Sequence, residues 1–412
     1  MVEAQTGRMD AIDYDAWRKN IRSDVTANFH YCMALAIARE ANRDAAIKHF
    51  RLALEANPDW GAPYFELAEL LMAAGRSAEA EEVRRIAVAH CPTYEAEGLL
   101  HRGRELAQIN HFDALPTLIA AAENFESVRE QAHNEIAHLL VARAKLQKAA
   151  GDHAAYIDIL LQAEGYGCQD PQGLYDLSLH YHQQGDGAKA VKTVLKACHH
   201  AQRDEKVKLL IAASGVLRME MRLPEAIAAL SEACELAPSM ARPRALLGSA
   251  MLALGHADGL DHLRAAIDLD GASAGIRMMY GEGLYAAGFQ KEAKEVLVRL
   301  RDNDPTNHRV ESDISLILAE DNQIENAVLM ARTAAEHFSQ SNWVWTNLGL
   351  VLDLAGQHVE AQKAFRQATV PSAQSEPRML WFQARLRPRY QKRLFHIFRE
   401  LQVPMPIAVV GD

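Results

Sequence analysis

The 412-residue sequence is poor in the two residues that interrupt helices, with only 23 glycines and 14 prolines. Both are disfavoured inside helices, so their scarcity favours a mostly helical chain with short turns. Five cysteines stand far apart without C-x-x-C spacing, which argues against a disulfide framework and a zinc site. No apolar run approaches the roughly 18 residues that a membrane span requires, and the first residues have no apolar signal core. We therefore expect a cytoplasmic protein.

Positive charge is also in deficit over the chain as a whole. The sequence has 44 Lys and Arg against 54 Asp and Glu, a formal net charge of −10, which argues against general nucleic-acid binding because such binding depends on neutralising phosphates. The C-terminal end departs from this balance through a basic run made of Arg378, Arg385, Arg387, Arg389, Lys392, Arg393 and Arg399. We interpret the run as the solvated face of a capping helix; the alternatives are an acidic protein partner, a membrane surface or RNA.

Motifs that carry familiar chemistry are absent from the sequence. The stretch from Gly281 to Ala286 matches the G-x-G-x-x-A nucleotide fingerprint in its letters, but that fingerprint needs a preceding strand, and none is predicted. His180 and His182 are two residues apart, so on a helix they point to different faces and are poorly placed to share an ion. No phosphate-binding loop, nucleophile elbow or kinase-like set occurs. We expect no cofactor, no bound metal and no enzymatic activity.

A repeated pattern of apolar and small residues runs through most of the chain. Its clearest copy lies between residues 342 and 369, where the marker positions are Trp345, Leu348, Gly349, Leu352, Ala361, Phe365 and Ala368. The large side chains recur at helical spacing on both sides of Gly356, and the small ones fall where a partner helix would come closest. Pro58 and Pro92 follow equivalent helices and are 34 residues apart. The pattern predicts pairs of helices that nest against one another.

This pattern resembles the tetratricopeptide family, a helix–turn–helix repeat of about 34 residues. The resemblance covers roughly residues 27–370. It implies an all-α fold: a right-handed superhelical solenoid of about ten stacked hairpins, with capping helices at both ends. We divide the chain into an N-terminal cap (1–26), regular repeats (27–94), degenerate or longer repeats (95–169), regular repeats (170–370), and a basic C-terminal capping helix with an apolar tail (371–412).

The resemblance also implies where a partner would bind. In this family the first helix of each pair lines the concave side, and the lining offsets in this sequence carry Tyr31, Phe65, Glu69, Tyr175, Leu179, Met278, Tyr285, Trp343 and Leu350. A row of exposed aromatic and apolar side chains suits an extended or helical peptide. The alternative is that the superhelix closes on itself or on the tail and buries these residues.

Two well-known binding modes of the family do not fit this sequence. Members that hold a C-terminal carboxylate use lysine, asparagine and arginine at lining positions, where this chain has Tyr31, Leu35 and Glu66. Members that hold a peptide backbone use one asparagine per repeat, and only Asn347 matches that offset. A partner segment is therefore expected to be held in another way.

The leading hypothesis is a non-enzymatic scaffold that binds a protein or peptide segment in its groove, with Glu69, Asp176 and Asp313 favouring a basic or neutral ligand. A second hypothesis is a regulatory sensor for a small peptide or effector, and a third is a non-catalytic subunit of an enzyme complex. Residues 404–412 are too apolar for an idle tail, so self-association through them is a further expectation.

Overall fold

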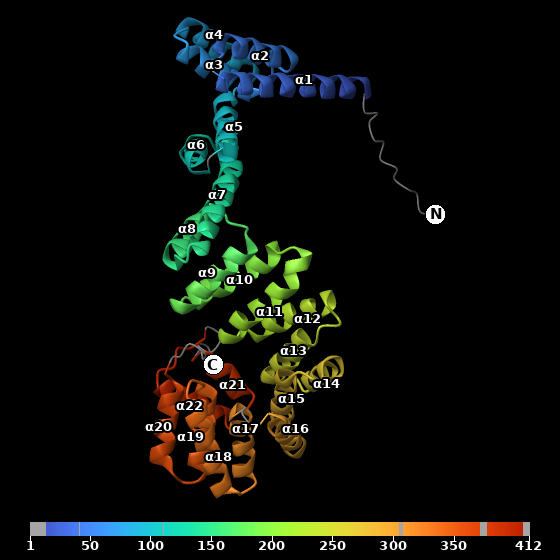
Figure 1. The fold of residues 1–412 in the computed structure, drawn as a ribbon, viewed down its shortest axis with the longest axis vertical. Coiled ribbons are helices and arrows are strands. Elements are labelled where there is room, and N and C mark those ends of the chain that lie inside the picture. Colours follow the sequence, from blue (N-terminus) through green and yellow to red (C-terminus); the bar gives the residue numbers. More distant parts are fainter. Residues whose placement is uncertain (1–13, 41, 110, 305–307, 371–376, 407–412) are drawn as a thin grey trace, which may run out of the picture. The chain divides into compact units, whose positions relative to one another are not determined.

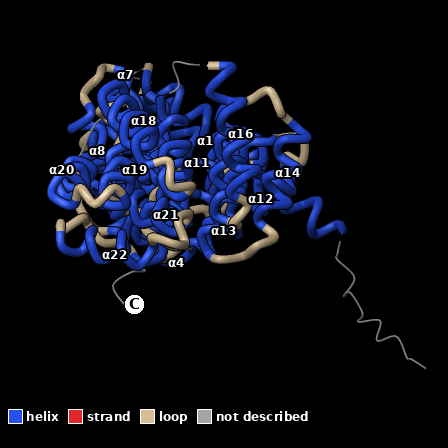
Figure 2. The backbone as a smooth tube through the Cα atoms, turned by 90° about the horizontal axis from the view of Figure 1, so that it is seen from below, coloured by secondary structure: helices blue, strands red, loops and turns tan. Residues whose placement is uncertain are grey.

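The computed structural model describes residues 14–40, 42–109, 111–304, 308–370 and 377–406. Within these ranges the chain forms 22 α-helices and one short 3-10 helix, and no strand (Figures 1 and 2). The predicted all-α class is thereby confirmed. None of these helices is long and apolar enough to cross a membrane.

The helices pack as consecutive antiparallel pairs, and the chain divides into two compact units at residue 168. Unit 1 contains four hairpins. They are α1 (Tyr14–Arg39) with α2 (Arg43–Ala56), α3 (Gly61–Ala73) with α4 (Ser77–His90), α5 (Tyr94–Ile109) with α6 (His111–Asn124), and, after the 3-10 turn Glu126–Val128, α7 (Arg129–Ala149) with α8 (His153–Gly165).

Unit 2 contains six more hairpins and two C-terminal helices. The hairpins are α9 (Pro171–Gln183) with α10 (Gly187–His200), α11 (Arg203–Met219) with α12 (Leu223–Leu236), α13 (Ala241–Leu254) with α14 (Gly259–Leu269), α15 (Ala274–Ala286) with α16 (Gln290–Asn303), α17 (His308–Glu320) with α18 (Ile324–His337), and α19 (Asn342–Leu354) with α20 (His358–Ala368). The last helices are α21 (Met379–Arg385) and α22 (Gln391–Glu400).

Local sequence sets the ends of these helices. The α9 helix begins after Asp170, whose carboxylate accepts a hydrogen bond from the backbone N–H of Gly173 at 2.7 Å, and Pro171 occupies the first turn, where no N–H is needed. The α13 helix ends at Gly255, which has a φ of +92°. Glycine enters this left-handed region without a side-chain clash, so the chain reverses there into the next helix.

Small residues permit the close approach of paired helices, as the pattern predicts. A Cβ atom on Gly349 would lie 2.5 Å from the Phe365 ring, and one on Gly281 would lie 2.8 Å from Leu297. At Gly248 the obstructing atom is the backbone oxygen of Gly259, at 2.4 Å. In each pair the first helix therefore rests directly on the second.

The start of the chain differs in detail from the expected cap. A single 26-residue helix, α1, runs from Tyr14 to Arg39 and crosses the expected boundary at residue 26 without a break. Its C-terminal part contributes Tyr31 and Ala34 to the core of unit 1. The first 13 residues of the expected cap lie outside the described residues.

Residues 377–406, which we call the C-terminal segment, form part of the core of unit 2. The chain leaves α21 at Leu386, passes Pro388 and re-enters a helix at Gln391, because proline cannot continue the ladder of helical hydrogen bonds. Trp381 and Phe398 are fully buried, with ring centroids 5.6 Å apart. The segment is thus built into unit 2.

Candidate functional site

The first helices of the last five hairpins in unit 2 line one cavity, and we call the face that they share the inner face. Among the first helices of the unit, α9 contacts α11, α13 contacts α15 and α17 contacts α19, and α21 packs against α11, α13 and α19. The C-terminal segment therefore lies on the face where the family resemblance places a bound segment (Figure 1). Part of the predicted groove is occupied by the chain itself.

Arg387 anchors the C-terminal segment at the centre of the inner face. Its guanidinium carbon lies 4.6 Å from the ring centroid of Tyr285 and 4.7 Å from that of Trp343, so the cation is held between two aromatic rings. One guanidinium nitrogen donates a hydrogen bond to Oδ1 of Asp313 at 2.5 Å. Since Arg387 and Asp313 are only 2% and 3% exposed, each charge is neutralised by the other.

The same carboxylate oxygen organises the rest of this cluster. Oδ1 of Asp313 also accepts hydrogen bonds from Nε1 of Trp343 at 3.2 Å and from Nδ2 of Asn347 at 2.9 Å. The predicted lining positions Asp313, Trp343 and Asn347 thus form a polar network that holds an arginine of the same chain. The charge of Asp313 is paired within the chain, so this residue is not free to select a basic partner.

Arg378 forms a second anchor at the other end of α21. It donates a hydrogen bond to Oε1 of Glu220, which lies just past the end of α11, and the same oxygen is 2.7 Å from Nδ1 of His182 on α9. Burial raises the pKa of Glu220. The hydrogen bond from His182 and the charge of Arg378 together lower this pKa by more than burial raises it, so the net shift is downward. The carboxylate therefore stays ionised against its two partners.

Two further arginines of the basic run reach acidic residues of the repeats. Arg393 pairs with Asp353, and Arg389 lies 3.8 Å from Glu320. The expectation of a solvated basic face therefore fails for Arg378 and Arg387, which are buried, and acidic groups of the same chain serve as partners for part of the run. The charge pattern indicated an acidic partner but not that it is intramolecular.

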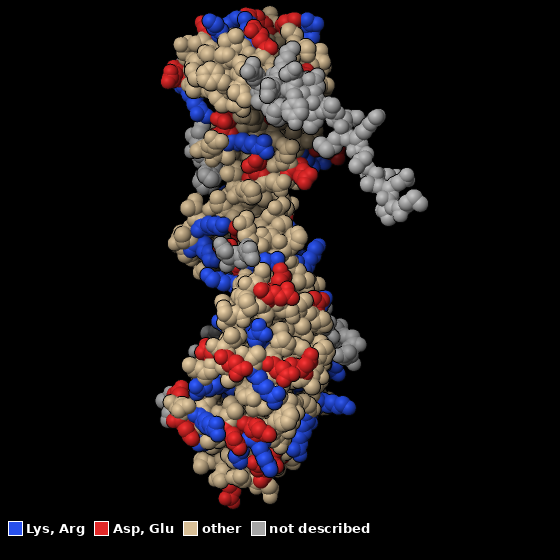
Figure 3. All heavy atoms as spheres, turned by 90° about the vertical axis from the view of Figure 1, so that its right-hand side faces the viewer, with Lys and Arg blue, Asp and Glu red and all other residues tan. Residues whose placement is uncertain are grey.

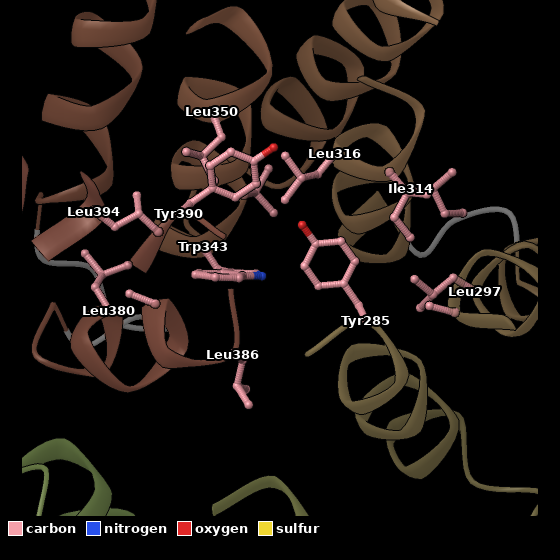
Figure 4. Close-up of a cluster of buried hydrophobic side chains, with 14 of the residues drawn as sticks. Tyr285, Leu297, Ile314, Leu316, Trp343, Leu350, Leu380, Leu386, Tyr390 and Leu394 are labelled. Atoms are coloured by element: carbon pink, nitrogen blue, oxygen red, sulfur yellow. The ribbon is translucent and has the colours of Figure 1, made fainter. Parts of the chain in front are cut away.

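The nine predicted lining residues fall into two groups. In unit 2, Tyr285, Trp343 and Leu350 are buried beside Leu380, Leu386 and Tyr390 of the C-terminal segment (Figure 4). Met278 is half-buried, as are Tyr175 and Leu179 on α9. The C-terminal segment thus covers one part of the predicted row and leaves the other accessible.

In unit 1, Tyr31 belongs to the core. Its hydroxyl lies 3.0 Å from Nδ1 of His101, and its ring packs against Phe50 and Trp60. Phe65 and Glu69 are half-buried. Arg102 engages both, because its guanidinium carbon lies 4.7 Å from the Phe65 ring centroid and one of its nitrogens lies 3.8 Å from Glu69.

A cavity of about 790 Å³ remains on the inner face beside α21. Its walls come from α11, α13, α15, α17, α19 and α21. They include the side chains of Met240, Met278, Met279, Met379, Phe382 and Trp343 together with Arg218, Arg242, Arg309, Asp270 and Glu282. Two of the predicted lining residues, Met278 and Trp343, therefore border this cavity. The volume is within the range of about 300–1,000 Å³ that ligand sites span.

Some charged groups in the cavity wall have an opposite charge beside them and others do not. Burial, followed by the neighbouring charge of Asp313, raises the pKa of Glu282 to about 7 against the opposing charges of Arg309 and Arg387. Burial, followed by the charge of Arg242, lowers the pKa of Arg218 to about 10. Among the described residues, neither Arg218 nor Arg242 has a carboxylate within ion-pair distance. The wall thus contains two neighbouring cations without a counter-charge.

Arg218 and Arg242 were not predicted from the sequence. They lie on first helices of their pairs but off the lining offsets carried over from the family, and their proximity depends on how α11 and α13 both pack against α21. A usable signal was two arginines on consecutive first helices without a carboxylate at helical spacing, which the sequence does show.

The spacing of the helices decides the kind of repeat. Helices α15, α17 and α19 begin at residues 274, 308 and 342, so each of these hairpins repeats after 34 residues, and Gly281 and Gly349 occupy equivalent contacts within their pairs. This is the tetratricopeptide repeat fold. In unit 2, six tetratricopeptide hairpins follow in sequence and the C-terminal segment caps them.

Several solved structures are similar to this chain at low sequence identity. Yeast Tom70 is 14% identical over 92% of this chain and 92% of its own, with a TM-score of 0.40. A tetratricopeptide repeat protein from Parabacteroides merdae is 11% identical over 58% of this chain and 96% of its own, with a TM-score of 0.39. TTC0263 of Thermus thermophilus is 14% identical over 46% of this chain and 98% of its own, with a TM-score of 0.37. Similarity this distant says nothing about partners.

No family model and no curated protein matches the chain. The fold assignment therefore rests on the helices, their 34-residue spacing and the close contacts described above.

Proposed function

We propose that the protein is a non-catalytic interaction scaffold whose inner face in unit 2 binds a segment of a partner protein. Stacked helical repeats generally present extended binding surfaces of this kind. The observation that carries the proposal is that this face already holds a polypeptide segment, seated by the stacked and ion-paired Arg387. A surface with aromatic rings and buried acids that accepts one segment has the chemistry to accept another in the cavity beside it.

The composition of the cavity wall supports a protein segment as the ligand. Four methionines line it, and methionine side chains adapt to different apolar partners because they are unbranched and polarizable. Arginine, methionine and aromatic residues are also the types enriched at protein interfaces. Met278 contributes from the predicted row, and Tyr175 and Leu179 extend the accessible surface along α9. In unit 1 the proposal assigns Phe65 and Glu69 to a second, smaller contact surface.

A regulatory sensor is the second candidate function. The observation that favours it is the cavity volume of about 790 Å³, which would also accommodate a small effector. The scaffold is the better supported of the two because the cavity is continuous with a face that holds a polypeptide.

The test is a selection of random 12-residue peptides, displayed with their C-termini fused to a coat protein, against the immobilised full chain. We expect binding peptides whose affinity falls at least about tenfold for the double variant Met278→Ala, Met279→Ala, because fully burying one methionine side chain contributes about 1.5–3 kcal/mol. Leu329→Ala, which removes a side chain 68% exposed on α18, is the matched control. The proposal would be contradicted if the selected peptides bound the double methionine variant as tightly as the Leu329→Ala control, or if no peptides were selected.

A further inference from the structure

The cavity on the inner face contains two cations, and no carboxylate of the described residues lies within ion-pair distance of either. Arg218 projects from α11, where its Nε donates to the backbone oxygen of Ser214 at 3.3 Å, and Arg242 projects from the first turn of α13. They are close enough for the charge of one to lower the pKa of the other. Holding like charges together in a partly desolvated wall is unfavourable. A ligand carboxylate between them would relieve both costs.

Two of the other arginines in the wall are already paired. Arg387 pairs with Asp313, and Arg309 lies 3.6 Å from Glu282. Asp270 is exposed and accepts a hydrogen bond from the backbone N–H of Ser273 at 3.2 Å, which leaves its negative charge in the wall. The two cations of the Arg218 and Arg242 pair outnumber this carboxylate, so the charge available to a ligand is positive.

Arg218 is held in place, and apolar surface flanks the pair on two sides. The guanidinium carbon of Arg218 lies 5.1 Å from the ring centroid of Phe382 on α21, so stacking restricts its orientation. Met379 and Phe382 line the cavity from the C-terminal segment, and Met278 and Met279 line it from α15. A carboxylate bound between the arginines would thus have apolar surface on both sides of it. This arrangement suits an acidic side chain with a residue before and after it in a peptide, and not the carboxylate at a chain end.

We infer that this cavity selects partner segments in which an aspartate or glutamate is flanked by apolar side chains, with the carboxylate placed between Arg218 and Arg242. The inference rests on the proposed function and specifies its ligand. The acidic lining residues predicted a basic or neutral ligand. The inferred ligand is acidic instead, because Asp313 is paired with Arg387.

The test uses the peptides selected above, resynthesised with acetylated and amidated ends, and titration calorimetry with the full chain. We expect the selected peptides to share an acidic residue with apolar neighbours. Replacing that residue by its amide should weaken binding at least about tenfold, as expected for a charge-assisted hydrogen bond to arginine. Arg242→Gln, at an exposed position, should cause a similar loss and should also remove most of the difference between the acidic and amide peptides.

Arg218→Gln serves as the second variant, with its fold checked by circular dichroism. Arg299→Gln, which changes a side chain 81% exposed on α16, should leave the affinity unchanged. Selected peptides that lack acidic residues, or that bind equally after amide replacement, would overturn this inference while leaving the scaffold function intact. Binding that requires a free C-terminal carboxylate would overturn it as well. No peptide binding at all would overturn both proposals.

Discussion

Gly248 shows how a missing side chain allows two helices of a repeat to touch. A Cβ atom there would lie 2.4 Å from the backbone oxygen of Gly259 and 2.9 Å from Leu263. Backbone cannot rotate away as a side chain can, so α13 and α14 would have to separate. At Gly281 and Gly349 the obstructing atoms belong to side chains that have some freedom to move. The Gly248 contact is therefore the least tolerant of the three.

We predict that Gly248→Ala destabilises unit 2 by about 1–3 kcal/mol, the usual cost of overpacking. Gly215→Ala is the matched control, since Gly215 lies inside α11 and its Cβ position has no atom within 4 Å. That substitution should stabilise the protein by about 0.5–1 kcal/mol, because alanine restricts the unfolded chain and favours helix. Urea denaturation of both variants measures the difference. Equal effects of the same sign would refute the packing argument.

Arg387 provides a second prediction at the scale of single residues. Arg387→Leu leaves the Asp313 carboxylate buried without its cation, and losing one partner of a buried pair costs about 3–5 kcal/mol. Adding Asp313→Asn removes the stranded charge and should recover part of the loss. Arg299→Ala, at an exposed ion pair, is the control and should change stability by less than about 0.5 kcal/mol. Chemical denaturation tests this, and a single variant as stable as the wild type would contradict it.

The sequence predicted the small residues better than the exposed ones. Gly281 and Gly349 could be assigned to helix contacts because local spacing alone determines which face of a helix they occupy. Trp343 and Tyr285 were placed on the correct first helices, but whether they are exposed depends on a segment that follows them in the chain. Nothing local to Asp313 indicates that Arg387, 74 residues later, is its partner.

At the scale of secondary structure elements, the C-terminal segment behaves as an additional pair of helices. Its side chains Leu380, Trp381, Leu394 and Phe398 are fully buried within the same cluster as Tyr285 and Trp343. Burying a large apolar side chain contributes about 1.5–3 kcal/mol. The segment is thus fixed in place by several such contacts and shapes the cavity permanently.

We predict that a chain ending at residue 376 loses several kcal/mol of stability and exposes the aromatic residues of the inner face. The measurements are thermal unfolding and the fluorescence of a dye that binds apolar surface. A chain ending at Pro406 keeps every described contact and is the control; it also tests the expected self-association, because it lacks most of the apolar tail. A 376-residue chain with unchanged unfolding would show that the segment is dispensable.

The break between α21 and α22 was predictable from Pro388, and the ten hairpins from their markers. The continuity of α1 was not predicted, because no cap or proline marks the boundary that was expected at residue 26. Marker residues locate the beginning of a repeat, but they do not show where an earlier helix starts.

At the scale of the whole molecule, charge is distributed finely over the surface while a few ionised groups are buried. Basic and acidic side chains are interspersed over the face of unit 2 in Figure 3. The buried groups matter more for stability, because exposed pairs contribute little. One buried cluster of unit 2 extends from Met221 to Val403, so a change in charge at a carboxyl buried beside it, such as Glu282, affects the unfolding of the whole cluster.

Two carboxyl groups give unit 2 opposite pH dependences. The pKa of Glu220 is lowered from 4.5 in the folded state, so its contribution to stability is present above pH 4.5 and is lost as the pH falls through the folded pKa. The pKa of Glu282 is raised from 4.5 to about 7. Its contribution is fully present below pH 4.5 and is lost as the pH rises from 4.5 through about 7. With respect to these two groups, unit 2 should be most stable near pH 4.5.

We predict that Glu282→Gln removes the alkaline loss and leaves the acid loss unchanged. A shift from 4.5 to about 7 corresponds to at most about 3 kcal/mol between pH 4.5 and 8.5, and the charges of Asp313, Arg309 and Arg387 around Glu282 determine how much is observed. Urea denaturation at pH 5, 7 and 8.5 measures it. Glu295→Gln, 70% exposed, should retain the wild-type profile. If the Glu282 variant lost as much stability as the wild type between pH 5 and 8.5, the loss would have to come from another group.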